Sequence, residues 1–133
     1  MRGFRNNRRR GASIVETAAG LFILIPIVLA LVDVAAAVLA QTANDSMCKH
    51  AARAAAEATN QTDASTAART VVQEFPTSPI ITAKRLVTDP VQYQANTRVT
   101  VVTEVTCTFP VPMFGWSSIN FHTDVTEPVV GTL

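Results

Sequence analysis

The feature that most constrains this chain is one long apolar run near its beginning. Residues 17–32 read TAAGLFILIPIVLALV without a charged side chain, and after Asp33 the sequence stays apolar to Ala40. A bilayer core about 30 Å thick needs about 20 apolar helical residues, and this run supplies them. We therefore expect residues 12–40 to form a transmembrane helix, because so long an apolar run is rare in a soluble chain of 133 residues.

Charge is distributed unevenly around that run. Residues 1–11 hold five arginines and no acid, whereas residues 41–133 hold six basic and eight acidic residues. Basic residues that precede a first span keep that end in the cytoplasm. We therefore expect a basic cytoplasmic leader over residues 1–11 and an extracytoplasmic domain over residues 41–133. A nucleic-acid site is the competing interpretation, but no basic or aromatic cluster elsewhere extends it.

Helical patterns continue beyond the apolar run. Residues 41–59 are rich in alanine, the best helix former, and small residues recur there at helical spacing. Asp63 is expected to cap a second, short helix over residues 63–75. Within the apolar run, Pro26 offers no N–H to the carbonyl four residues earlier, so we expect a kink there.

The last third of the chain is rich in β-branched residues and alternates between apolar and polar side chains. We expect three strands, at residues 80–88, 97–109 and 119–126, with a turn over residues 94–97. In the second strand the apolar face comprises Val99, Val101, Val105, Cys107 and Phe109. The predicted fold class is α+β, with a long helix that leaves the membrane and packs its alanine face on a small three-stranded antiparallel sheet.

The two cysteines, Cys48 and Cys107, fall on the expected outer helix and the expected central strand. A pair on the oxidising side of a membrane favours one disulfide, and two free buried thiols are the alternative. We expect no metal site, because there is no CxxC spacing and the only histidines are His50 and His122.

A loop between the last two strands carries large apolar residues. Met113, Phe114 and Trp116 stand in the segment PVPMFGWSS, residues 110–118. One interpretation is that these side chains fold back and close the bottom of the sheet. The other is an exposed contact surface for a partner.

The junction between leader and apolar run holds the most informative spacing. Gly11 follows three arginines, and Glu16 stands five positions after it, just before the apolar run. A carboxylate at the edge of a hydrocarbon core is costly unless a cation pairs with it. If the chain were cut after Gly11, Ala12 would present a free α-ammonium group close to Glu16 of the same or a neighbouring chain.

The stretch RRRGASIVE, residues 8–16, followed by LIPIVL and LVD, resembles the TadE-like minor pilins (pseudopilins) of the tight-adherence, or Flp, pilus system. Thr17 differs from the aromatic residue that commonly follows the glutamate in that family. The resemblance implies that a prepilin peptidase cuts between Gly11 and Ala12 and that Glu16 guides subunit packing. It also implies a bacterial cytoplasmic membrane, with other pilin-like subunits and inner-membrane pilus assembly proteins as partners.

The main alternative is a secretory signal peptide cleaved after Ala40, which would release a small secreted binding module. A subunit of an unrelated envelope complex is a third possibility. We expect no enzyme activity, no cofactor and no small-molecule substrate, because the sequence has no phosphate-binding glycine loop, no HExxH and no nucleophile with a placed base.

Overall fold

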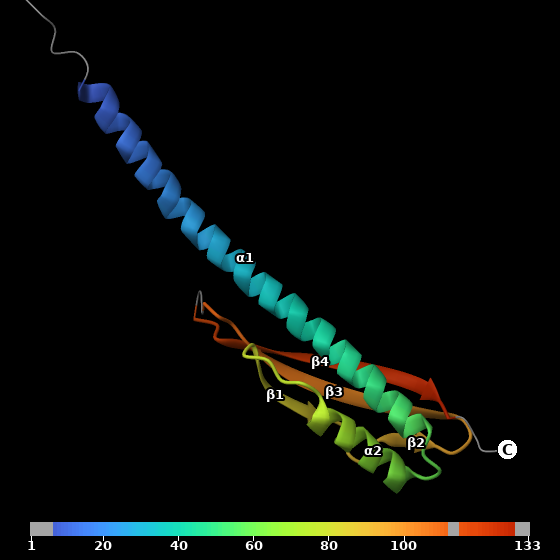
Figure 1. The fold of residues 1–133 in the computed structure, drawn as a ribbon. Helices are drawn as coiled ribbons and strands as arrows, with labels where there is room; N and C mark the ends of the chain where they lie inside the picture. Colours follow the sequence, from blue (N-terminus) through green and yellow to red (C-terminus); the bar gives the residue numbers. More distant parts are fainter. Residues whose placement is uncertain (1–6, 112–114, 130–133) are drawn as a thin grey trace, which may run out of the picture.

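A computed structural model describes residues 7–111 and 115–129, with the side chains of the first helix from Ser13 on. Helix α1 (Asn7–Ala56) is a single element of 50 residues and includes Pro26. Figure 1 shows α1 as one gently curved helix, whose N-terminal half projects away from the rest of the molecule. The expected transmembrane helix and the expected outer helix are therefore one continuous helix, which ends at Ala56 and not at residue 59.

Helix α2 (Gln61–Glu74) begins two residues earlier than expected. Asn60 is its N-cap, and the Asn60 side-chain oxygen accepts a hydrogen bond from the backbone N–H of Asp63 at 2.9 Å. Asp63 lies instead in the first turn, where its negative charge faces the positive end of the helix dipole. The prediction of Asp63 as the cap is therefore wrong, because an asparagine three residues upstream takes that position.

The sheet has four strands, all antiparallel to their neighbours: β1 (Ile81–Leu86), β2 (Gln92–Gln94), β3 (Arg98–Thr108) and β4 (Ser118–Pro128). Strand β4 pairs along the whole length of β3. Strands β1 and β2 pair with successive halves of β3, so they share its other edge. The prediction of three strands is corrected to four, because β2 has only three residues and is too short to show an alternating pattern.

The predicted turn between β2 and β3 is confirmed. Asn96 has a φ of 56°, a left-handed conformation that asparagine tolerates better than most residues. The backbone N–H of Thr97 donates to the carbonyl of Gln94 at 3.0 Å and closes the turn.

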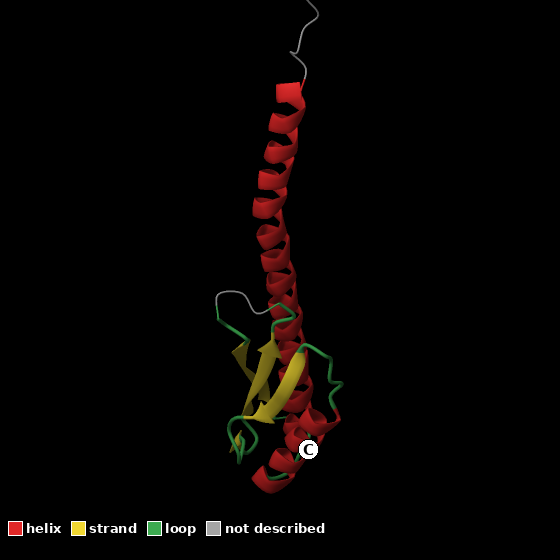
Figure 2. Cartoon of the chain, turned by 90° about the vertical axis from the view of Figure 1, so that its left-hand side faces the viewer, coloured by secondary structure: helices red, strands yellow, loops and turns green. Residues whose placement is uncertain are grey.

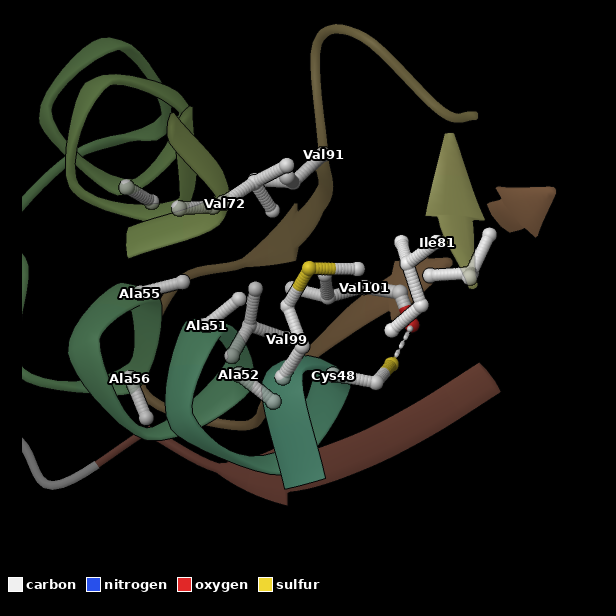
Figure 3. Packing of buried hydrophobic residues seen from close by; sticks show 14 of the residues in the cluster. Cys48, Ala51, Ala52, Ala55, Ala56, Val72, Ile81, Val91, Val99 and Val101 are labelled. Atoms are coloured by element: carbon white, nitrogen blue, oxygen red, sulfur yellow. Dashed lines mark hydrogen bonds between the residues drawn. The ribbon is translucent and has the colours of Figure 1, made fainter. Parts of the chain in front are cut away.

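The core lies between the C-terminal half of α1 and one face of the sheet. Figure 3 shows the small side chains of α1 beside the valines of β3. The buried residues of α1 are Ala36, Ala40, Asn44, Met47, Cys48, Ala51, Ala52, Ala55 and Ala56, and those of β3 include Val99, Val101, Val105 and Cys107. This confirms that the alanine face of α1 covers the sheet, and small residues allow the helix backbone to lie close to it.

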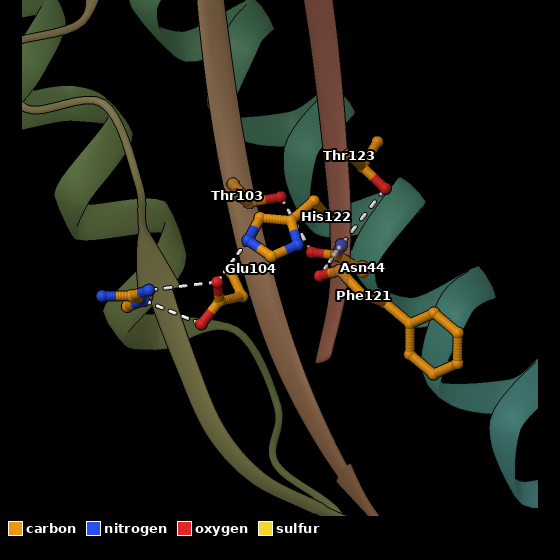
Figure 4. A network of polar contacts seen from close by, with 7 residues as sticks. Asn44, Thr103, Glu104, Phe121, His122 and Thr123 are labelled. Atoms are coloured by element: carbon orange, nitrogen blue, oxygen red, sulfur yellow. Dashed lines mark hydrogen bonds and ion pairs between the residues drawn. The ribbon is translucent and has the colours of Figure 1, made fainter. Parts of the chain in front are cut away.

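A buried polar cluster fixes where α1 lies along the sheet (Figure 4). Asn44 of α1 is fully buried, and its Nδ2 donates to the carbonyl of Phe121 at 3.0 Å and to Thr123 Oγ1 at 3.1 Å. The hydroxyl of Thr103 in β3 donates to Asn44 Oδ1 at 2.8 Å. A buried amide is costly without partners, so this contact favours one register of helix on sheet.

The disulfide prediction is wrong: Cys48 and Cys107 are both free and buried. Cys48 Sγ lies 3.3 Å from the carbonyls of Val101 and Thr123, either of which can accept its one proton, whereas Cys107 Sγ lies 3.8 Å from the carbonyl of Ala36. Ala36 precedes Cys48 on α1 by about 18 Å of helix rise. A disulfide requires Cα atoms within about 7 Å, so the register of β3 on α1 keeps the sulfurs apart.

Candidate functional site

The N-terminal half of α1 is covered with exposed apolar side chains. Every side chain at residues 13–28 is exposed, and Phe22 is 83% exposed. Among the described residues, the most N-terminal hydrogen bond between α1 and the sheet domain is at Asp33, whose Oδ1 accepts from the backbone N–H of Val111 at 3.2 Å. Residues 13–32 span about 30 Å of helix, the thickness of a bilayer core.

By length and composition, α1 contains a segment that can cross a membrane, and a signal sequence near the N-terminus has the same properties. The contacts of the sheet domain with α1 reach back to Asp33, earlier than the start expected at residue 41. The apolar segment over residues 13–32, which is exposed except at the half-buried Leu29 and Ala30, is here called the rod.

Glu16 lies on the rod, among the exposed side chains of Ile14 and Val15. No ion pair within residues 13–111 and 115–129 involves Glu16. Its neighbour Thr17 donates its hydroxyl to the carbonyl of Ser13 at 2.9 Å, within the helix itself. The carboxylate of Glu16 is therefore presented to whatever surrounds the rod.

Gly11 and Ala12 lie on the backbone of α1, about one turn before Glu16. Their surroundings, and the side chains of the basic leader, lie outside the described residues. The first turn of α1 as it begins at Asn7 contains no acidic residue.

Of the three large apolar residues in the loop before β4, only Trp116 is described, and Met113 and Phe114 lie outside the described residues. Trp116 is 74% exposed, so it does not fold back under the sheet. The backbone N–H of Phe109 donates to the carbonyl of Ser117 at 3.0 Å, which joins the two ends of the loop. Figure 2 shows that these ends lie at the end of the sheet nearest the rod.

Sequence reasoning missed a row of charged side chains across the outer face of the sheet. Arg85 of β1, Glu104 of β3 and His122 of β4 lie directly opposite one another in register (Figure 4). Arg85 Nε and one terminal nitrogen donate to the two oxygens of Glu104 at 2.9 and 3.0 Å, and His122 Nε2 also contacts Glu104. Glu104 lies opposite the apolar face that the alternation of β3 predicts, but only strand register shows its partners.

The two neighbours cover Glu104, whose side chain is 7% exposed although that of Arg85 is 66% exposed. The hydrogen bonds from Arg85 lower the pKa of Glu104, while its burial acts in the opposite direction. The hydrogen bonds to Glu104, and then its charge, also raise the pKa of Arg85. A carboxylate held ionised in this way is a weak proton acceptor, so the row joins strands and does not resemble a general base.

Two further features of the described residues bear on ligand binding. No cluster of three or more histidine, cysteine or acidic residues there could hold a metal ion. A hollow of about 370 Å³ beside α2 contains Arg69 and Asp89, which pair with each other. The rod is therefore the strongest candidate for a functional surface.

A signal-peptide cut after Ala40 would divide the folded domain. Ala36 and Ala40 are buried against the sheet, and α1 continues through them without interruption. Removing residues before 41 would take both alanines from the core and uncover Cys107, whose thiol contacts the carbonyl of Ala36. The packing therefore argues against a mature chain that starts at Gln41.

Comparisons with known proteins add no relative. No protein-family model matches the chain, and no curated protein or solved structure is significantly similar to it.

Proposed function

We propose that this chain is a membrane-anchored, TadE-like minor pilin (pseudopilin), a structural subunit that helps to assemble a tight-adherence (Flp) pilus or a related secretion system. The observation that carries the proposal is the exposed carboxylate of Glu16 on an exposed apolar rod, five positions after Gly11 in the stretch RRRGASIVE. The rod would lie in a bacterial cytoplasmic membrane, with the leader in the cytoplasm and the sheet domain outside.

Cleavage between Gly11 and Ala12 by a prepilin peptidase gives Glu16 a cationic partner. The new helix would begin at Ala12, and Glu16 would follow one turn later, about 6 Å along the axis. Its carboxylate would then lie near the positive end of the helix dipole and near an α-ammonium group. In lipid, where an unpaired carboxylate is costly, the new N-terminus of a neighbouring subunit is an equally good partner.

The rod has the surface that lateral packing of helices requires. Its side chains over residues 13–28 are exposed, and a Cβ added at Gly20 would meet no atom within 4 Å outside the adjacent helix backbone. Small residues such as Ala18, Ala19 and Gly20 allow close approach of helices in membranes. Because α1 runs unbroken from the rod into the core, the height of Glu16 along a neighbour would also set the height of the outer domain.

The proposal is tested by replacing Glu16. Glu16→Ala should leave the amount of protein in the membrane fraction unchanged, because the rod stays apolar, and should sharply reduce pilus assembly or secretion. Thr17→Ala is the matched control, since Thr17 is exposed beside Glu16 and, among the described residues, its hydroxyl bonds only to the backbone of its own helix. Glu16→Gln separates loss of charge from loss of hydrogen bonding. Normal assembly by Glu16→Ala would contradict the proposed role.

A further inference from the structure

Two contacts tie one end of the sheet domain to α1 just beyond the rod. The backbone N–H of Val111 donates to Asp33, and the thiol of Cys107 contacts the carbonyl of Ala36. The loop that holds Trp116 begins at this end, where β3 finishes, and returns to β4 at Ser118. The height of this loop above a membrane therefore follows from which residues of α1 lie in the membrane. That α1 spans a membrane at all rests on the proposed function.

The possible heights are few. A core of about 30 Å that begins at Ser13 ends near Val32, and one that begins after Glu16 ends near Ala36. The headgroup layer beyond it is about 5–7 Å thick, or about four more helical residues. In the first placement Asp33 and Ala36 lie in the headgroup layer, and in the second they lie within about 5 Å of the edge of the core. The end of the sheet bonded to them lies at the same height.

Two separate elements carry exposed apolar side chains near this end of the sheet. On α1, Val34, Val38 and Leu39 are exposed beyond the rod, on the part of the helix whose other side packs on the sheet. On the loop, Trp116 is 74% exposed. Tryptophan combines a large apolar ring with an N–H donor and is enriched where hydrocarbon meets headgroups.

We propose that the end of the sheet domain around Trp116 rests in the headgroup layer of the membrane that α1 spans, with the Trp116 indole in contact with lipid. The partner of this surface is the bilayer interface itself. The domain would then be held at two points, by α1 and by Trp116, which fixes its tilt toward the membrane before any subunit assembles. Departure of the subunit from the membrane would require release of both.

Trp116 is the only tryptophan of the chain, so its fluorescence reports on this surface directly. The full chain is placed in phosphatidylethanolamine–phosphatidylglycerol vesicles that contain lipids brominated at shallow or deep acyl positions. We expect blue-shifted emission, strong quenching by shallow bromines, weak quenching by deep bromines, and protection from aqueous iodide. Emission typical of water, with full iodide quenching and no bromine quenching, would overturn the proposal.

A second variant separates failure of this inference from failure of the proposed function. In Trp116→Phe combined with Phe22→Trp, the single tryptophan lies in the middle of the rod, at a position where the native Phe22 is 83% exposed. Deep bromines should quench it strongly. If they do so while Trp116 remains in water, the membrane span stands and the Trp116 surface is refuted. If Trp at position 22 is also in water, the membrane anchor itself is refuted.

If Trp116 contacts a protein and not lipid, its quenching should depend on the protein-to-lipid ratio. Contact with another copy of the chain would protect Trp116 from iodide only at high protein-to-lipid ratios and without bromine quenching. The proposal requires the same bromine quenching at every ratio, including those at which most vesicles hold one copy. Protection that disappears on dilution into more lipid would therefore overturn it in favour of a subunit interface.

Discussion

Asn44 and Glu104 are buried polar residues that take their partners from other elements. Asn44 joins α1 to β3 and β4 from the inner side of the sheet, and Glu104 joins β1 to β4 across the outer side. Alanine and valine pack in many nearly equivalent ways, whereas hydrogen bonds of fixed geometry select one. These two residues therefore give the small domain much of its defined register.

Replacing Asn44 should reveal that role. Asn44→Ala leaves the hydroxyl of Thr103 and the carbonyl of Phe121 without their partner, so we expect a loss of about 1–3 kcal/mol in the free energy of unfolding. Denaturant unfolding of the full chain in detergent micelles, followed by circular dichroism, measures it. The control is Thr42→Ala, since Thr42 is exposed and its hydroxyl, within the described part of the chain, bonds only to Val38 of its own helix. Equal stability of the two variants would refute the role of Asn44.

The row across the outer face predicts a dependence on pH. The pKa of Glu104 is lowered in the folded state, chiefly by its hydrogen bonds from Arg85. Its contribution to stability is therefore present above the ordinary pKa of a glutamate and is lost as the pH falls through the lowered pKa. We expect Glu104→Gln to be less stable than the parent at pH 7, with the difference shrinking in acid.

Unfolding midpoints of parent and Glu104→Gln, measured from neutral pH down to the lowest pH at which both fold, test that expectation. Glu127→Gln is the control, because the nearest cation to Glu127 within the described residues, Arg53, is 4.0 Å away and exposed. The control should cost less stability at neutral pH than Glu104→Gln does. A difference between parent and Glu104→Gln that stays constant with pH would rule out the Arg85 pairing as its source.

The absence of a disulfide between Cys48 and Cys107 can be tested by counting the thiols that react with a label. Burial raises the pKa of both Cys48 and Cys107, which disfavours the reactive thiolate. We expect a maleimide to label neither residue in the folded protein and both after denaturation without reductant, read as added mass. Denatured protein that accepts no label without reductant would show that the two sulfurs are joined.

At the scale of elements, the alternating and helical patterns predict most of the fold. The β3 face of Val99, Val101, Val105 and Cys107 is buried as the alternation requires. The alternation of apolar and polar residues does not show which residue of one element lies opposite which residue of another. The same alternation fits several alignments of the two elements. For this reason the packing of α1 against β3 was predicted correctly, whereas the pairing of Cys48 with Cys107 was not.

The candidate site was predictable to the same degree. The spacing of Gly11 and Glu16 is visible in the sequence, and so is the apolar run that the structure shows as an exposed rod. The partners of Glu104 were not visible, because Arg85 and His122 lie 19 and 18 positions away and meet only through strand pairing. The position of Trp116 near the rod likewise depends on the contact of Val111 with Asp33, which no periodicity records.

The close approach of α1 to the sheet is tested by enlarging one alanine. Ala51 is fully buried, so Ala51→Leu should force side chains or backbone to move and cost about 1–3 kcal/mol of stability. Ala35→Leu is the matched control, because Ala35 is exposed on the same helix. Denaturant unfolding of both variants compares them. Equal midpoints would show that α1 does not pack tightly on the sheet.

At the scale of the whole molecule, one helix has two kinds of surface. Residues 17–28 are apolar and exposed on every side, as in a membrane span or a signal sequence, whereas the second half of α1 is apolar on one side and covers a sheet. With no break between the halves, a force or displacement at the rod passes directly to the outer domain. An assembly subunit that is positioned by its membrane helix needs this continuity.

The measurement that tests the account most directly is the intact mass of the protein taken from membranes of cells with and without the prepilin peptidase. The account predicts a chain that begins at Ala12 when the peptidase is present and retains Met1–Gly11 when it is absent. A leader that remains in both preparations would contradict the account, because Glu16 would then never meet the new N-terminus on which the proposed packing depends.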